Sequence, residues 1–328
     1  MARGMRRGAR RAGAVRPEQE PEASAQARST PRGTPLWVLL LILVLPVLGG
    51  CTRLFFYPDR ELVLNPATLG LEFEEVRLRS GDGVSLHGWY LPAETEDAAG
   101  SVLFLHGNAE NISNHLPGVA WLPERGFNVL LIDYRGYGRS EGAVSLKGAL
   151  ADVEAALAYL AEREPPERPL AVLGQSLGGA LAPYAVSRSP HRERVRALVV
   201  DSAFASYQGI TREKLASTWL TWPFQWLAWN VPDRYSPSGA MAELAPIPVL
   251  ITHNRGDRII PVRHAWELYW AAEEPKRICL FPAGGHGTTF LRPEARDLLA
   301  GYLWRRFGRP GEPPRSENGV PRFRIDTL

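Results

Sequence analysis

Two segments in the first third of the chain, 73–79 and 84–90, alternate apolar with polar residues. A period of two residues predicts half-buried strands, and the Ser-Gly-Asp-Gly sequence at 80–83 is a hairpin turn signal. The next segment, 101–105, is apolar without interruption, which is typical of a strand buried on both faces. These patterns predict a hairpin that leads into the interior of a sheet.

Beyond this hairpin, short apolar runs alternate with longer segments whose apolar residues recur at helical spacing. This alternation implies an α/β fold, with a mainly parallel sheet covered by helices on both faces. The predicted strands are 128–132, 170–173, 195–200, 249–252 and 278–281, and the predicted helices are 146–163, 179–188, 262–272 and 293–307.

An insertion at about 203–245 departs from this rhythm and carries four tryptophans. Their 3-4-3 spacing places them along one face of a helix, which Pro223 either begins or breaks. On one interpretation the indoles pack the insertion onto the domain. On the other they form an aromatic cap over a site, where they wall an acyl chain or touch a membrane surface. The four are Trp219, Trp222, Trp226 and Trp229, of which the first three are candidates for a substrate pocket.

The N-terminal region has the pattern of an export signal. Residues 1–35 are rich in Arg, Pro, Ala and Gly, a composition typical of disorder, and 36–48 are apolar, with the length of a signal-peptide core. The following Leu-Gly-Gly-Cys sequence, which ends at Cys51, resembles a bacterial lipoprotein cleavage signal. It predicts an exported protein held at a membrane of the bacterial cell envelope by a lipid on Cys51. An uncleaved signal anchor and an ordinary secreted chain are the alternatives.

Charge and cysteine content narrow the choice of partners. Eight arginines and three glutamates give residues 1–50 a net charge of +5, which leaves −2 on the other 278 residues of a chain whose total is +3. A main domain without basic excess argues against nucleic acid as a partner. Besides Cys51 the chain has only Cys279, so a disulfide framework is excluded.

The sequence Gly174-x-Ser176-x-Gly178 lies where a predicted strand meets a predicted helix. In that context it predicts a nucleophilic serine on a tight turn, with glycines that leave room for a strained backbone. The alternative is a glycine-rich turn with an incidental serine. Because a serine hydroxyl is a weak nucleophile, Ser176 requires a general base and a group that orients the base.

Four of the seven histidines follow Ser176. His286 lies in a glycine-rich loop after the last predicted strand, which makes it the predicted base. The other three have other settings: His264 is inside a predicted helix, His191 is in an arginine-rich turn, and His253 precedes the candidate acid.

Two aspartates follow strands and are candidates for the acid. Asp257 is favoured over Asp201 because its strand adjoins the one that delivers His286, whereas Asp201 is placed to cap the start of the insertion. Asp233, inside the insertion, is a third candidate.

A tetrahedral intermediate needs fixed donors for its oxyanion, each worth about 3 kcal/mol. The amide of Leu177, the residue after Ser176, is one predicted donor because it begins the helix. The second should come from the turn after 101–105, with Asn108 as the predicted residue and Ala109 as the alternative.

From about 73 to 307 the chain resembles the α/β-hydrolase superfamily, in particular its serine-aminopeptidase-like hydrolases. One departure is His253-Asn254, where that group commonly has His-Gly. We therefore expect one hydrolase domain over 51–308, with the cap at about 203–245. The tail at 309–328 is rich in Pro and Arg, a composition that predicts disorder. The residues that carry the resemblance are His106-Gly107-Asn108-Ala109-Glu110-Asn111, Asp133-Tyr134-Arg135-Gly136-Tyr137-Gly138-Arg139-Ser140, Gly174-Gln175-Ser176-Leu177-Gly178-Gly179, Asp257 and Gly285-His286.

The expected activity is that of a serine hydrolase which cleaves a small-molecule or lipid ester or thioester without a metal or an organic cofactor. An aminopeptidase-like activity is the alternative within enzymes. It requires acidic groups near the site, and the insertion offers Glu213, Asp233 and Glu243. A lipoprotein that binds a partner or a lipid without catalysis is the alternative of a different class.

Overall fold

The computed structural model describes residues 55–309. The predictions on the leader, the signal segment, Cys51 and the tail beyond 309 fall outside these residues. Within the described part of the chain, none of the helices is long and apolar enough to cross a membrane.

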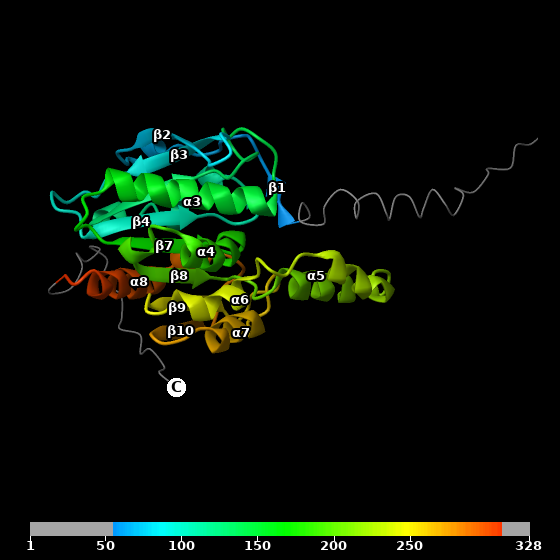
Figure 1. The fold of residues 1–328 in the computed structure, drawn as a ribbon. Helices are drawn as coiled ribbons and strands as arrows, with labels where there is room; N and C mark the ends of the chain where they lie inside the picture. The colour runs from blue at the N-terminus through cyan, green and yellow to red at the C-terminus, as the bar shows by residue number, and fades with distance from the viewer. Residues whose placement is uncertain (1–54, 310–328) are drawn as a thin grey trace, which may run out of the picture. The chain divides into compact units, whose positions relative to one another are not determined.

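An eight-stranded sheet forms the centre of the fold (Figure 1). Only the β2–β3 and β3–β6 pairings are antiparallel, and the other five are parallel. This confirms the predicted α/β fold and its entry through a hairpin. In spatial order the strands are β10 (Lys276–Phe281), β9 (Val249–Asn254), β8 (Val195–Asp201), β7 (Leu170–Gln175), β4 (Gly100–Leu105), β6 (Phe127–Ile132), β3 (Ser85–Leu91) and β2 (Glu74–Arg79).

Helices cover both faces of the sheet. The side chains of β6 show the division, because Leu130 and Ile132 join one apolar core while Val129 and Leu131 join the other. The first core also holds residues of α3 (Leu146–Arg163), α4 (Leu177–Arg188), α6 (Pro237–Met241) and α7 (Arg263–Ala271). The second holds residues of α2 (Ile112–His115) and α8 (Pro293–Arg306).

A second, two-stranded sheet was not predicted. It pairs β1 (Tyr57–Pro58) in parallel with β5 (Ala109–Glu110). The amide of Tyr57 donates to the carbonyl of Asn108 at 2.8 Å. The segment that precedes the hairpin is therefore fastened to the turn that follows β4.

The insertion folds as α5 (Tyr207–Ala216), the 3-10 helix η6 (Trp222–Asn230), α6 and the 3-10 helix η7 (Ala242–Leu244). Pro223 stands in the first turn of η6, so it begins this helix rather than breaking one. Trp219 lies before η6, between it and α5. Because a 3-10 helix has three residues per turn, the 3-4-3 spacing does not align the indoles here as it would on an α-helix.

Arg135 fastens the hairpin to α3. Its guanidinium donates to both oxygens of Asp152, at 2.8 and 3.0 Å, and to Asp82 in the hairpin turn at 2.6 Å. The hydrogen bond to Asp152 raises the pKa of Arg135 above its usual value. Gly148 is required beside it, because a Cβ there would lie 2.4 Å from the guanidinium Nε.

We expect Arg135→Leu to lower the free energy of unfolding by about 3–5 kcal/mol, because it leaves the fully buried carboxylate of Asp152 without its cation. Urea denaturation measures the loss. Arg139→Leu is the matched control, because Arg139 pairs with Glu75 where both side chains are more than two-fifths exposed, and its loss should stay below about 1 kcal/mol. Equal losses in the two variants would contradict the assigned role of Arg135.

Candidate active site

Ser176 occupies a tight turn between β7 and α4, with φ of 53° and ψ of −112°. This left-handed backbone is strained for a residue with a side chain, and it is held by the glycines on either side. A Cβ at Gly174 would lie 2.4 Å from the carbonyl oxygen of Gly178, and one at Gly178 would lie 2.1 Å from that of Leu105. The turn therefore accepts only glycine at these positions.

The side chains of Ser176, His286 and Asp257 form one hydrogen-bonded series. His286 Nδ1 lies 2.7 Å from Asp257 Oδ2, and His286 Nε2 lies 2.8 Å from Ser176 Oγ. Because an ionised carboxylate only accepts, Nδ1 carries the proton and Nε2 is left to accept from the serine hydroxyl. The structure thus brings the three predicted residues together in an arrangement that can remove a proton from Ser176.

Asp257 is fixed in its charged form. Its Oδ1 accepts from the amides of Ile259 and Ile260, at 2.8 and 2.9 Å. Burial raises the pKa of Asp257, but the hydrogen bonds from His286 and these amides outweigh it and hold the pKa below its usual value. Above that pKa the carboxylate is ionised and orients the imidazole.

Asp201, the alternative acid, has different partners. Its carbonyl accepts from the amide of Ser176, and its carboxylate accepts from the hydroxyl of Thr252, both at 2.8 Å. Burial raises the pKa of Asp201. In this structure Nδ1 of His286 is bonded to Asp257, while Asp201 holds the backbone of the serine turn.

The other downstream histidines of the core also have partners elsewhere. His264 accepts from the amide of Ala205 at 3.2 Å, and its Nε2 lies 3.0 Å from Glu213. His253 Nε2 donates to the carbonyl of Ile260 at 2.8 Å. Both histidines thus fasten loops around the site.

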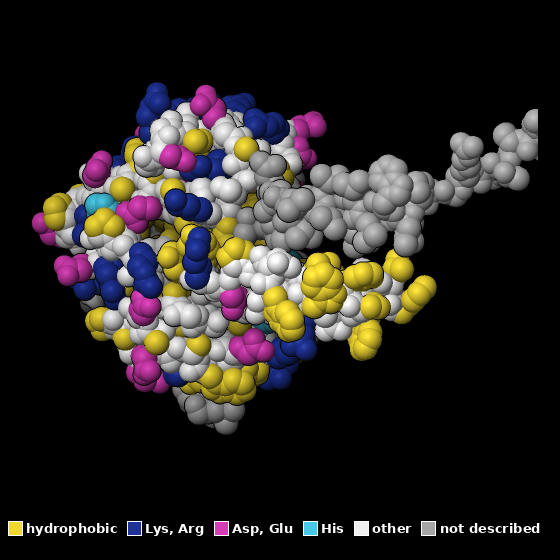
Figure 2. Space-filling model, turned by 45° about the vertical axis from the view of Figure 1, so that its right-hand side comes forward, with side chains coloured by type: hydrophobic (Ala, Val, Ile, Leu, Met, Phe, Trp, Pro, Cys, Tyr) yellow, Lys and Arg dark blue, Asp and Glu magenta, His cyan; other side chains and the backbone are white. Residues whose placement is uncertain are grey.

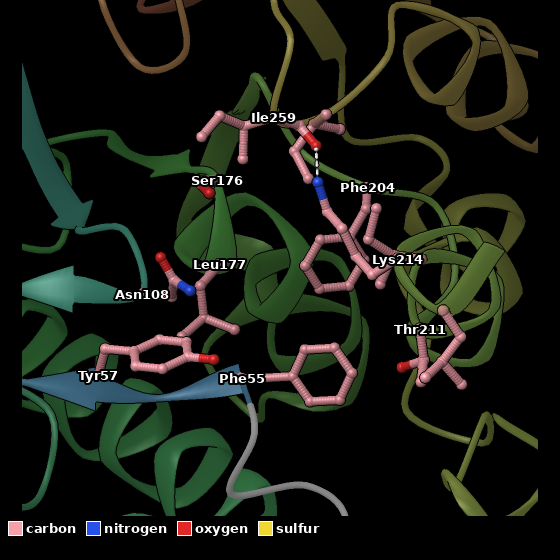
Figure 3. Close-up of a pocket in the computed structure, with 12 residues that line it drawn as sticks. Phe55, Tyr57, Asn108, Ser176, Leu177, Phe204, Thr211, Lys214 and Ile259 are labelled. Atoms are coloured by element: carbon pink, nitrogen blue, oxygen red, sulfur yellow. Dashed lines mark hydrogen bonds between the residues drawn. The ribbon is translucent and has the colours of Figure 1, made fainter. Parts of the chain in front are cut away.

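A pocket of about 380 Å³ opens beside Ser176 (Figure 3). Asn108 and Leu177 line it together with Ser176, as a pair of oxyanion donors would. Trp219, Trp222 and Trp226 are outside this lining and are 54–86% exposed. The residues that line the pocket are Phe55, Tyr57, Asn108, Ser176, Leu177, Phe204, Ile210, Thr211, Lys214, Leu215, Ile259 and Ile260.

Two of these residues, Phe55 and Tyr57, come from the segment that precedes the hairpin. The ring of Phe55 packs against Tyr207 at the start of α5, with a centroid distance of 5.1 Å. Tyr57 is held through the β1–β5 pairing. The only signal in the sequence is the run of aromatic residues at 55–57, which a solvated linker would not need.

The turn before Asn108 is shaped by His106. Its Nδ1 donates to the carbonyl of Gly107 at 2.8 Å, and its own carbonyl accepts from the amide of Gly178 at 3.0 Å. Burial lowers the pKa of His106 well below its usual value, so the ring is neutral. These contacts give His106 a structural role in the turn.

Gln175 is a residue whose part at the site was not predicted. Its Nε2 donates to the carbonyl of Gly287, next to His286, at 2.8 Å, and its Oε1 accepts from His115 Nδ1 at 2.9 Å. Gln175 therefore connects the serine turn with the loop that carries the base. The available signal is its position immediately before Ser176.

Comparison with known proteins identifies the class. The family model for "Serine aminopeptidase, S33" matches residues 96–245. The uncharacterized protein YfhR of Escherichia coli K12 is 37% identical over 241 residues, which is 72% of this chain and 80% of YfhR. The α/β-hydrolase domain-containing protein WAV2 of Arabidopsis thaliana is 32% identical over 263 residues, 76% of this chain and 82% of WAV2.

Among solved structures, the esterase Pf2001 of Pyrococcus furiosus superposes with a TM-score of 0.61 at 22% identity. The match covers 76% of this chain and 98% of the esterase. The chain belongs to the α/β-hydrolase superfamily, and it is a serine hydrolase in the general sense that its family and site define.

We expect Gln175→Leu to slow the reaction of Ser176 with a fluorophosphonate probe by roughly fivefold, because it removes the bond to the loop of His286, worth about 1 kcal/mol, at nearly constant volume. The labelling rate measures the effect. Thermal unfolding is followed alongside, because lower labelling with normal stability separates misplacement of the base from misfolding. An unchanged labelling rate would refute the positioning role.

Proposed function

We propose that the protein hydrolyses carboxylic esters or thioesters with an apolar acyl group through an acyl-enzyme on Ser176. The single observation that carries this proposal is the bonded series of Ser176, His286 and Asp257 beside an apolar pocket. The esterase Pf2001, similar in fold, is consistent with it.

In this mechanism His286 takes the proton of Ser176 as Oγ attacks the acyl carbon. The amides of Leu177 and Asn108 donate to the oxyanion of the tetrahedral intermediate. His286 then gives the proton to the leaving alcohol or thiol, whose bond to the acyl carbon breaks. A water molecule, deprotonated by His286, then attacks the acyl carbon of the acyl-enzyme. The bond from that carbon to Oγ breaks, His286 returns the proton to Oγ, and the carboxylic acid is released.

The surroundings of the pocket favour an acyl ester over a peptide with a free amino terminus. Each acid considered for binding an ammonium group is engaged elsewhere: Glu213 with Arg263 and His264, Asp233 with Ser206 and Ser236, and Glu243 with Arg188. Among the residues that line the pocket, Lys214 is the charged one, and its cation would repel a substrate ammonium.

The setting that we propose is a membrane surface. The signal pattern that ends at Cys51 supports export and a lipid tether there, four residues before the pocket residue Phe55. An ester that carries an acyl chain would be within reach of such an enzyme.

We expect a fluorophosphonate probe to label the wild-type protein, and Ser176→Ala to abolish both labelling and aryl-ester hydrolysis, because the attacking oxygen is removed. Gel fluorescence and absorbance assays measure the two effects. Ser202→Ala is the matched control, a buried serine at the end of the neighbouring strand that should leave labelling in place. Labelling that persists in Ser176→Ala would exclude Ser176 as the nucleophile. If the wild-type protein hydrolyses none of the esters, a binding protein without catalysis is favoured.

We expect hydrolysis of aryl esters to accelerate as the acyl chain lengthens from acetyl to medium chains, by up to about fourfold for each methylene that the pocket buries. An alanyl arylamide should be cleaved far more slowly than any of these esters. A series of p-nitrophenyl esters, with Ser176→Ala as the blank, gives the comparison. Faster turnover of the arylamide would establish the aminopeptidase-like alternative instead.

A further inference from the structure

The cap exposes an unusual apolar surface, which we call the tryptophan face. Figure 2 shows hydrophobic side chains gathered on the lobe of α5 and the residues after it. The four indoles alone expose on the order of 500 Å², which is more than a soluble surface normally leaves without a function. The tryptophan face consists of Trp219 (86% exposed), Leu220 (65%), Trp222 (62%), Trp226 (54%) and Trp229 (75%).

These indoles do not attach the cap to the domain. Within η6 only Ala228 is buried, and the cap is held instead by other apolar side chains, among them Tyr207 and Ile210 of α5, and by polar bonds. Glu213 pairs with Arg263 and His264, and Lys214 donates to the carbonyl of Ile259 at 2.6 Å. The interpretation that the tryptophans pack the insertion onto its own domain is therefore wrong.

The charge pattern indicates what covers this surface. Residues 215–232 carry no charged side chain, and the whole insertion at 203–245 has three basic and three acidic residues. Tryptophan concentrates at the interface of a phospholipid bilayer, where its ring is apolar and its N–H is hydrated. A surface of this kind suits a zwitterionic bilayer, to which electrostatic attraction contributes little.

The start of the described chain gives an independent argument. Phe55 packs against Tyr207, the first residue of α5. Cys51, the predicted lipid attachment, lies four residues earlier and so reaches at most about 14 Å from Phe55. The ten residues of α5 extend about 15 Å from the same place toward η6. The tether and the tryptophan face can therefore reach one membrane surface.

We propose that the tryptophan face seats the cap in the interface of a zwitterionic phospholipid bilayer. Helix α5, next to the tryptophan face, forms one wall of the pocket through Ile210, Lys214 and Leu215. The start of η6 is bonded to α5, because the hydroxyl of Thr221 donates to the carbonyl of Leu215 at 2.7 Å. Docking therefore brings the pocket to the lipid surface. The substrate class is then acyl esters held in a membrane. This consequence rests on the proposed function, whereas the docking of the cap is independent of it.

The test uses the full-length chain in phosphatidylcholine vesicles whose lipids are brominated near the headgroup, and it measures quenching of tryptophan fluorescence. Trp219→Ser combined with Trp229→Ser removes two of the four indoles of the tryptophan face. The quenching that comes from the tryptophan face should therefore fall by about half. Trp270→Ser is the matched control, an indole on α7 that is 70% exposed. Trp37 lies before Cys51, so cleavage of the predicted signal removes it from every variant alike, and an uncleaved chain retains it in every variant alike.

The inference is overturned if the double variant is quenched as strongly as the wild type. It is also overturned if quenching by the face disappears at high salt, or if sedimentation shows that the face holds a second copy of the chain away from lipid. In addition, the double variant should hydrolyse a vesicle-embedded ester severalfold more slowly, with a soluble short-chain ester unaffected. Absence of all hydrolysis with normal quenching would reject the proposed function alone.

Discussion

The close approach of α4 to the middle of the sheet is the constraint on which the site depends. The amide of Gly178 bonds to the carbonyl of His106 at the end of β4, and the amide of Ser176 bonds to Asp201 at the end of β8. These two bonds hold Ser176 in a backbone conformation that costs about 1–3 kcal/mol by itself. The hydroxyl of Ser176 is thereby presented at the carboxyl edge of the sheet, and Leu177, the first residue of α4, lines the same pocket.

Everything that acts with Ser176 comes from loops at this edge. Strand β9 leads to Asp257, β10 leads to the loop of His286, and β4 leads to Asn108. Because these strands are parallel, their carboxyl ends meet at one edge of the sheet even though the residues are far apart in sequence. Gln175 then joins two of the loops directly, through the carbonyl of Gly287.

Much of this was predictable, for a physical reason. The helix at 146–163 agrees with α3 to the residue, because Ser145 caps its start and its apolar positions are periodic. The order of serine, acid and base is local information as well, since each follows a recognisable strand. The choice of Asp257 over Asp201 rested on which strands adjoin, and the β9–β10 pairing has that adjacency.

The wall of the pocket was not predictable in the same way. Phe55 and Tyr57 reach it only through the pairing of β1 with β5, about fifty residues away, and a two-residue strand leaves no periodic signal. The cap also differs from its prediction. The spacing of its tryptophans predicts an α-helix, whereas Pro223 lies in the first turn of a 3-10 helix. Packing of the indoles onto the domain is one of the two interpretations of the sequence, and only the tertiary structure shows that they are exposed.

One of the polar bonds that attach the cap also connects it with the acid. Lys214 of α5 donates to the carbonyl of Ile259, and the amide of Ile259 donates to the carboxylate of Asp257. A cap bonded in this way is a fixed wall of the pocket. A change in its position would move Ile259 and, through it, Asp257, which orients His286. A contact at the tryptophan face therefore acts on a part of the molecule that is hydrogen-bonded to the hydrolytic centre.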